Sequence, residues 1–285
     1  MVAFFFLLPW EKLEKAQGIL NNPPADQKPL PTFQVDNLEA QAAIVIDEKT
    51  GQVLFTKNPN EILPLASITK LMTAIVATEN LNSDYPIFIT ENHLSLGSNA
   101  GLLAGTTWKF KDLKDYMLTT SSNGAAKAMS DAVNQKTGRD FIFLMNTKAK
   151  TLGLNSLHFN NETGLDEMGG RAGGSGSVQD VAKLMTHIIK YEPNLIESTR
   201  LSTIRKETID HATFFGQNTN LIIRTIPGFI GSKTGFTDQA GGNLVIAFDA
   251  GLDQPVIIVV LGSTQDGRFS DMTKLVNKTI ETLAK

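Results

Sequence analysis

Ser67-Ile68-Thr69-Lys70 is the stretch that decides the fold, because it places a serine and a lysine three residues apart at the start of an apolar helical repeat. The lead-in 58–66 is extended and contains two prolines, and the repeat continues at Ile68, Leu71, Met72, Ile75 and Val76. Residues three apart share a helix face, so the Ser67 hydroxyl and the Lys70 amine can meet. Free N–H groups at the helix N-terminus would also stabilise a developing oxyanion.

A hydroxyl beside an amine predicts a nucleophile that is activated without histidine. Taken alone, Ser-x-x-Lys equally fits an N-cap serine next to a solvated lysine. The choice between the two interpretations depends on the rest of the chain.

Composition excludes several classes of function. The chain has 285 residues, 31.0 kDa and a net charge of -3 without a basic run, so we expect no nucleic-acid partner. The absence of cysteine excludes disulfides and thiolate metal sites. The histidines lack paired spacing, so we expect no metal and no cofactor; they are His93, His158, His187 and His211.

The N-terminus is unusually apolar from Val2 to Leu8, with Trp10 close behind. A spanning helix needs about 20 apolar residues, and the positive leader of a signal peptide is missing. The segment is either the outer end of a clipped membrane anchor or signal, with Trp10 at the interface, or a stretch that packs on the protein or a neighbour. Residues 20–33 hold four prolines and predict a linker. We therefore separate residues 1–36 from a folded domain at 37–285.

The elements expected within 37–285 describe an α+β protein whose sheet is split along the chain. Hydrophobic patterns predict a hairpin, a mostly helical middle, three returning strands and a closing helix whose apolar stripe packs on the sheet. The sheet part would comprise 37–66 and 206–285, and the helical part 67–205. The individual predictions are strands at 41–47, 52–57, 229–234, 242–249 and 254–262, helices at 67–80, 123–133, 140–152, 178–191 and 268–284, a helix capped by Asp112, and a flexible loop at 169–176.

Two further stretches resolve the meaning of the first. Ser121-Ser122-Asn123 lies where a loop enters a helix, and Lys233-Thr234-Gly235 ends a strand. Singly they fit a helix-capping cluster and a solvated edge-strand lysine. The ordered triple S-x-x-K, S-x-N, K-T-G is the signature of penicillin-binding proteins and class A β-lactamases.

From about Glu39 to its end, the chain resembles a low-molecular-mass penicillin-binding protein, a D-alanyl-D-alanine carboxypeptidase of the serine peptidase S11 type. The resemblance extends to 43–47, 161–166, 233–241 and 259–262 ahead of Arg268-Phe269. It implies an antiparallel sheet flanked by helices and a mostly helical subdomain, with the active site between them.

The same resemblance implies roles for individual residues. Ser67 would attack the D-Ala-D-Ala peptide bond and form an acyl-enzyme, while Lys70 takes its proton. Ser121 would relay a proton to the leaving amine, and Asn123 would hold the substrate amide and Lys70. Lys233 and Thr234 would face the terminal carboxylate of the substrate, and Gly235 would continue their strand. The N–H groups of Ser67 and Phe236 would form the oxyanion hole. Arg268 is the preferred candidate for the carboxylate-binding arginine, ahead of Arg224 and Arg171.

This chemistry requires Lys70 to be partly neutral near pH 7, against a usual pKa of about 10.4. Burial and the second cation, Lys233, would both lower the Lys70 pKa. The two lysines would then belong to one site.

Three alternatives remain open on the sequence. A β-lactamase would use Glu162 to activate water, although Thr163-Gly164-Leu165-Asp166 is the carboxypeptidase pattern. A D,D-endopeptidase would carry the same motifs, and an idle wall-binding module would keep only the fold. The implied partners are peptidoglycan stem peptides ending in D-Ala-D-Ala and β-lactams. The implied location is extracytoplasmic, with the N-terminal apolar segment as the candidate membrane contact.

Overall fold

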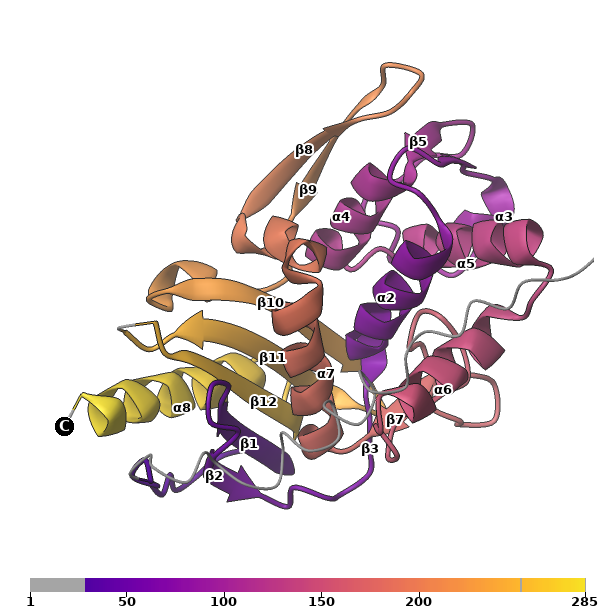
Figure 1. Cartoon of the computed structure of the whole chain (residues 1–285). Coiled ribbons are helices and arrows are strands. Elements are labelled where there is room, and N and C mark those ends of the chain that lie inside the picture. The colour runs from indigo at the N-terminus through magenta and orange to yellow at the C-terminus, as the bar shows by residue number, and fades with distance from the viewer. Residues whose placement is uncertain (1–28, 252, 285) are drawn as a thin grey trace, which may run out of the picture.

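The computed structural model describes residues 29–251 and 253–284, which form a sheet lobe and a helical lobe (Figure 1). The sheet lobe is built on five strands in the order β10-β11-β12-β1-β2, and every neighbouring pair is antiparallel. These strands are β1 (Ala42–Asp47), β2 (Val53–Lys57), β10 (Phe229–Thr237), β11 (Gly241–Asp249) and β12 (Pro255–Ser263). The predicted α+β class with a split antiparallel sheet is confirmed.

The sheet is covered on both faces, which explains its continuous apolar strands. Along β12, Val256, Ile258 and Val260 belong to one buried cluster, and Ile257, Val259 and Leu261 belong to the other. This alternation follows from the two-residue period of a strand. Helix α8 (Gly267–Leu283) packs on β11 and β12 at the first face, and α7 (Val178–Tyr191) packs at the second. The apolar stripe of the closing helix therefore lies on the sheet, as predicted.

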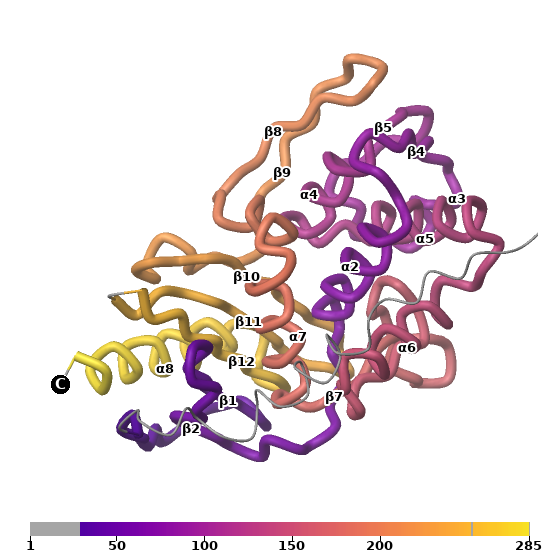
Figure 2. Tube along the Cα trace, in the orientation of Figure 1, coloured from indigo at the N-terminus to yellow at the C-terminus, as the bar shows by residue number. Residues whose placement is uncertain are grey.

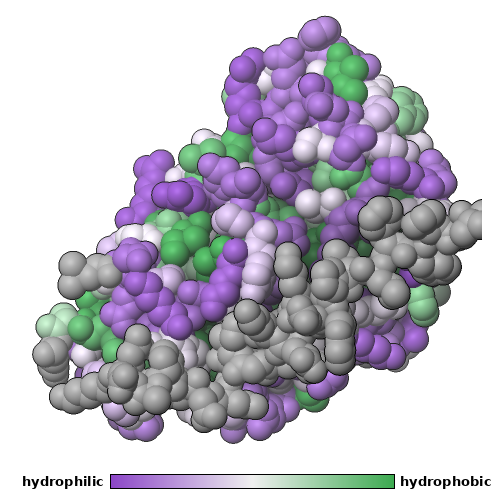
Figure 3. Space-filling model, in the orientation of Figure 1, coloured by the Kyte–Doolittle hydropathy of each residue, from purple (hydrophilic) through white to green (hydrophobic). Residues whose placement is uncertain are grey.

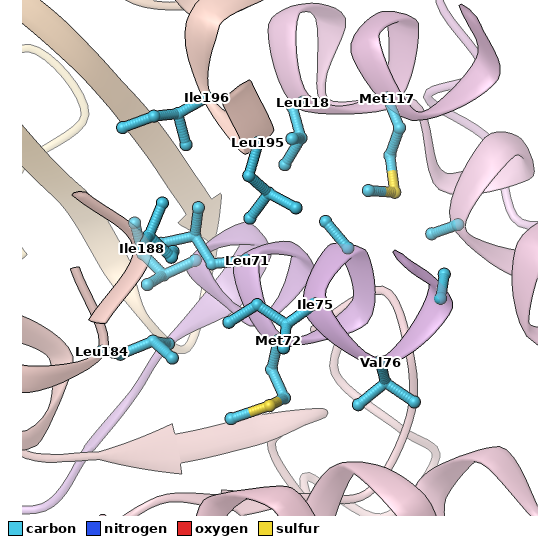
Figure 4. Close-up of a cluster of buried hydrophobic side chains, with 14 of the residues drawn as sticks. Leu71, Met72, Ile75, Val76, Met117, Leu118, Leu184, Ile188, Leu195 and Ile196 are labelled. Carbon is cyan, nitrogen blue, oxygen red and sulfur yellow. The ribbon is translucent and has the colours of Figure 1, made fainter. Parts of the chain in front are cut away.

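The helical lobe surrounds one buried helix, α2 (Lys70–Asn80). Figure 4 shows Leu71, Met72, Ile75 and Val76 of α2 among side chains from α4, α7 and the segment around Leu195. Because most positions of α2 are buried, its N-terminal end is held rigidly at the boundary with the sheet lobe. The other helices of this lobe are α3 (Glu91–Leu94), α4 (Phe110–Thr120), α5 (Asn123–Thr137) and α6 (Phe141–Thr151).

Short strands and 3-10 helices complete the two lobes. The strands are β3 (Leu63–Pro64), β4 (Pro86–Phe88), β5 (Thr107–Lys109), β6 (His158–Phe159), β7 (Gly174–Gly176), β8 (Thr203–Glu207) and β9 (Thr213–Gln217). The 3-10 helices are η1 (Ala66–Thr69), η2 (Pro193–Leu195), η3 (Glu197–Arg200) and η4 (Ile223–Thr225). Within the described part of the chain, β8 and β9 pair only with each other, and their hairpin projects away from the main sheet (Figures 1 and 2).

Three local expectations differ from the structure. The turn that holds Ser67 is the 3-10 helix η1 rather than the first turn of an α-helix. Helix α4 begins at Phe110, so Asp112 lies in its first turn rather than at its N-cap. A carboxylate in the first turn is stabilised by the positive end of the helix dipole. Residues 174–176 form β7, which pairs with β3 and β6 instead of remaining a loop.

The visible surface is mainly hydrophilic, with apolar patches that are separated from one another (Figure 3). Within 29–251 and 253–284, no helix combines the length and the apolar character needed to cross a membrane. The apolar stretch Val2–Leu8 and Trp10 lie outside the described residues, as does most of the proline-containing linker.

Candidate active site

The backbone around Ser67 is held in an unusual conformation. Ala66, directly before it, is buried and has a φ of +47°, in the left-handed region that L-residues rarely adopt. Gly164 lies against this turn so closely that a Cβ there would collide with the carbonyl oxygen of Ala66. The turn aims Ser67 toward Lys70, whose Nζ lies 2.8 Å from the Ser67 Oγ.

Lys70 is completely buried and has three hydrogen-bonding neighbours. Its Nζ lies 2.8 Å from Asn123 Oδ1 and 2.7 Å from the Thr163 carbonyl oxygen, in addition to the Ser67 contact. Both of these oxygens can only accept, so they would take the two N–H bonds of a neutral amine. The remaining lone pair then faces the Ser67 hydroxyl, which is the arrangement that a general base needs.

The electrostatics of the two lysines favour this neutral form. Burial lowers the pKa of Lys70 to about 7, against the opposing charge of Glu162. Burial also lowers the pKa of Lys233, and the charges of Lys70 and Arg268 lower it further. The predicted coupling between the two buried lysines is therefore present, and burial is the largest cause of both lowered pKa values.

Residues from the second motif form the opposite side of the site. Ser121 ends α4 in a left-handed conformation with φ of +63°, and Lys233 Nζ donates to its Oγ at 2.8 Å. Asn123 begins α5, and its Nδ2 donates to the Gly97 carbonyl oxygen at 3.2 Å. This second contact fixes which end of the amide faces Lys70, because it uses the NH₂ group and leaves Oδ1 for the lysine.

Strand β10 carries the third motif along the free edge of the sheet. Gly235 permits its close approach to the nucleophile, because a Cβ there would lie 2.8 Å from the Leu65 carbonyl oxygen and 3.1 Å from the Ser67 nitrogen. Phe236, the next residue, is 39% exposed. The structure thus brings Ser67, Lys70, Ser121, Asn123, Lys233 and Gly235 together, with Thr234 and Phe236 on the same strand.

The three candidate arginines have different surroundings. Arg268 is 8% exposed and donates from Nη1 to the Gly235 carbonyl oxygen at 2.8 Å, while its buried Nε has no hydrogen-bond partner among the residues that the structure describes. Arg171 pairs with Glu167, and Arg224 donates to Ser202. Of the three, Arg268 is the one that contacts the third motif.

Glu162 lies two residues before Gly164, and its charge acts on Lys70. In the described residues, no hydrogen bond joins its carboxylate to Ser67 or Lys70, and its backbone oxygen accepts from Thr73. The described chain also contains no group of three or more histidine, aspartate or glutamate side chains arranged to hold a metal ion.

Residues 29–265 match the sequence model of peptidase S11, D-alanyl-D-alanine carboxypeptidase. The chain belongs to the peptidase S11 family. This S11 chain is 32% identical over 246 residues to the D-alanyl-D-alanine carboxypeptidase DacF of Bacillus subtilis, covering 84% of this chain but only 61% of DacF. It is also 32% identical over 273 residues to a D-alanyl-D-alanine endopeptidase of Pseudomonas aeruginosa, covering 92% of this chain and 83% of that protein.

Solved structures agree with this membership and confirm the predicted fold. Penicillin-binding protein D2 from Listeria monocytogenes, in its ampicillin-bound form, is 30% identical with a TM-score of 0.72, over 88% of this chain and all of that one (100%). The Streptomyces K15 DD-transpeptidase is 26% identical with a TM-score of 0.77, over 86% of this chain and 98% of that one.

Sequence reasoning missed the backbone groups of the site. The carbonyl oxygens of Thr163 and Gly97 and the strained Ala66 carry no residue-specific signature of their role. The one available signal was Gly164, since a glycine inside a polar run often marks a left-handed or tightly approached backbone.

Proposed function

We propose that this chain is a serine D-alanyl-D-alanine carboxypeptidase that removes the terminal D-alanine from peptidoglycan stem peptides. The observation that carries the proposal is the set of contacts around Lys70, in which two carbonyl oxygens direct the amine lone pair at Ser67. The DacF relative, the family match and the ampicillin-bound neighbour support the same activity.

In the first half of the reaction, Ser67 Oγ attacks the carbonyl carbon between the two D-alanines while its proton moves to Lys70. The oxyanion is held by the N–H groups of Ser67 and Phe236, which lie on η1 and on the edge strand β10. When the intermediate collapses, the peptide C–N bond breaks and the D-alanine nitrogen takes a proton relayed from Lys70 through Ser121. Asn123 holds both Lys70 and the substrate amide.

In the second half, water attacks the ester carbon and gives a proton to neutral Lys70; the bond to Ser67 Oγ then breaks, and Lys70 returns the proton to the serine oxygen. Lys233, Thr234 and Arg268 face the free carboxylate of the terminal D-alanine and give the site its preference for a chain end. A β-lactam acylates the same serine through opening of its ring.

Mass spectrometry after mixing with benzylpenicillin tests the proposal. We expect the protein mass to rise by one penicillin per chain, with the adduct on Ser67, and we expect Ser67→Ala to show no adduct. An unchanged mass in the wild-type protein would refute the proposal. An adduct that forms on the wild-type protein but not on Ser67→Ala would exclude an idle wall-binding module.

The second candidate function is D,D-endopeptidase cleavage of peptidoglycan cross-links, because endopeptidases from three organisms are among the relatives, at 32%, 30% and 32% identity. Chromatography of digested wall fragments separates the two activities: a carboxypeptidase shortens pentapeptides, while an endopeptidase converts dimers to monomers. Nitrocefin separates both from a β-lactamase, since rapid multiple turnover would require the water-activating role of Glu162.

These substrates place the proposed site of action outside the cytoplasmic membrane, in the periplasm or on the outer face. We propose that the apolar segment at residues 2–8 mediates any contact with that membrane. Removing residues 1–28 should then shift the protein from the membrane fraction to the soluble fraction without changing benzylpenicillin acylation.

A further inference from the structure

The segment Asn218-Thr219-Asn220 is fixed by two buried asparagines. Asn218 Nδ2 donates to the carbonyl oxygens of Thr199 at 2.7 Å and Leu201 at 2.9 Å, and its Oδ1 accepts from the Asn220 nitrogen at 2.8 Å. Asn220 Nδ2 donates to Ser232 Oγ at 3.0 Å on β10. The exposed fractions of the two asparagines are 9% and 2%. The backbone of this segment is therefore locked both to η3 and to the motif strand.

Between the asparagines, Thr219 contacts the carboxylate-binding side of the site. Its backbone nitrogen donates to the Thr119 carbonyl oxygen at 3.2 Å, and its Oγ1 lies 2.5 Å from Thr234 Oγ1. The Thr219 side chain is half-buried and the Thr234 side chain is buried. Across the described residues, the Thr219 hydroxyl has no other hydrogen-bond partner.

Two hydroxyls in contact share one hydrogen, and its direction matters here. If Thr219 donates, Thr234 accepts and keeps its own hydrogen free to donate to a carboxylate. If Thr234 donates, its hydrogen is used within the protein. A bound carboxylate selects the first arrangement, since it can only accept and since successive hydroxyls polarise one another toward a negative charge.

We infer that Thr219 is a positioning residue for substrate recognition: its hydroxyl donates to Thr234 and orients the Thr234 hydroxyl toward the substrate carboxylate. This inference rests on the proposed function, which places that carboxylate at Lys233 and Thr234. It predicts a contribution to selecting substrates with a free carboxylate, and none to the reaction of Ser67 itself. A purely structural role is already filled by the asparagines, whose side chains fix the segment.

The test compares acylation by benzylpenicillin with acylation by its neutral methyl ester, each followed by mass spectrometry. We expect Thr219→Val, which keeps the side-chain shape, to slow acylation by the acid about tenfold, a typical effect for a hydrogen bond to a charged group. The methyl ester should react with the wild type and the variant at rates within about twofold. Thr219→Ser should restore the wild-type ratio of acid to ester.

Thr225→Val is the matched control. Thr225 lies six residues further along the chain, in η4, and its hydroxyl donates to the Ile222 carbonyl oxygen. It should leave both rates unchanged. An equal loss for the acid and the ester in Thr219→Val, or no loss for either, would overturn the inference while leaving the proposed function intact. Failure of the wild type to be acylated by benzylpenicillin would instead refute the proposed function.

Discussion

At the scale of single residues, the site depends on which hydrogen bonds Lys70 makes in its charged and neutral forms. A protonated lysine offers three N–H bonds, and the three neighbours of Lys70 could satisfy all of them. Removing one proton leaves the two carbonyl contacts intact and reverses only the contact with Ser67. The surroundings therefore tolerate both protonation states, and burial decides the balance by lowering the Lys70 pKa to about 7.

Acylation should accordingly rise with pH through the Lys70 pKa, because the neutral amine is the reactive form. Between pH 6 and pH 8 the rate with benzylpenicillin should increase about tenfold and then level off. Glu162 raises the Lys70 pKa by its charge, so Glu162→Gln should lower that pKa and move the rising limb to lower pH. Stopped-flow or quenched mass spectrometry across this range provides the measurement.

Glu281→Gln, an exposed position on α8, is the control for removing one negative charge. It should leave the profile in place. A profile that is flat from pH 6 to pH 8 would contradict the role assigned to Lys70, and an unshifted limb in Glu162→Gln would contradict the role assigned to that carboxylate.

The side chains of the site were predictable, and several of its supports were not. Ser67, Lys70, Ser121, Asn123 and Lys233 could be placed together because their types and order form a recognisable chemical pattern. The carbonyl oxygens that orient them could not, since every residue carries one and only the fold selects which is used.

At the scale of elements, the site is formed where η1, the turn around Gly164 and the edge strand β10 meet. Each approaches the next at backbone distance, which is why glycines occur at 164 and 235. The sequence patterns predicted β11 and β12 well, because strands buried on both faces are long and apolar. The same patterns ended β10 at residue 234 although it continues to Thr237, since its last residues are mostly small or polar. The hairpin β8–β9 was missed, because one of its faces is exposed and the alternation of Phe214 and Gly216 with exposed neighbours is short.

Gly164→Ala should slow acylation strongly, because the added Cβ collides with the carbonyl oxygen of Ala66, directly before Ser67. Displacing Ser67 by about 1 Å is expected to cost about 100-fold in rate. Gly169→Ala is a matched control: its φ of +90° imposes the same kind of backbone strain as the φ of +80° at Gly164, but its Cβ meets nothing within 4 Å. The benzylpenicillin rates of the two variants should differ widely, and similar rates would show that the close approach does not matter.

At the scale of the whole molecule, one buried carboxylate on α8 joins the residues just before β1 to the end of β12. Asp271 is fully buried and accepts from the backbone nitrogens of Glu39 at 3.1 Å and Ala40 at 2.8 Å, and from Ser263 Oγ at 2.9 Å. Glu39 and Ala40 are 232 and 231 residues from Asp271 in sequence, whereas Ser263 is only 8 residues away. The carboxylate therefore closes the sheet lobe on the side opposite α7.

Asp271→Ala should lower the free energy of unfolding by about 3 kcal/mol, because it leaves buried N–H groups without an acceptor. Urea denaturation measures this loss. Asp266→Ala, at an exposed position before α8, should change it by less than about 0.5 kcal/mol. Folded Asp271→Ala protein should still be acylated by benzylpenicillin, and equal stabilities of the two variants would contradict the role of Asp271.

The two-lobed arrangement has a consequence for how the protein responds to warming. The groups on α2 and α5 belong to one lobe and those on β10 to the other, but one hydrophobic cluster continues from α2 through α7 to β1, β11 and β12. Parting the lobes would therefore expose apolar side chains that otherwise become exposed only on unfolding. We therefore expect thermal inactivation and melting to coincide, so that the loss of reaction with benzylpenicillin and the loss of the circular dichroism signal follow one temperature curve.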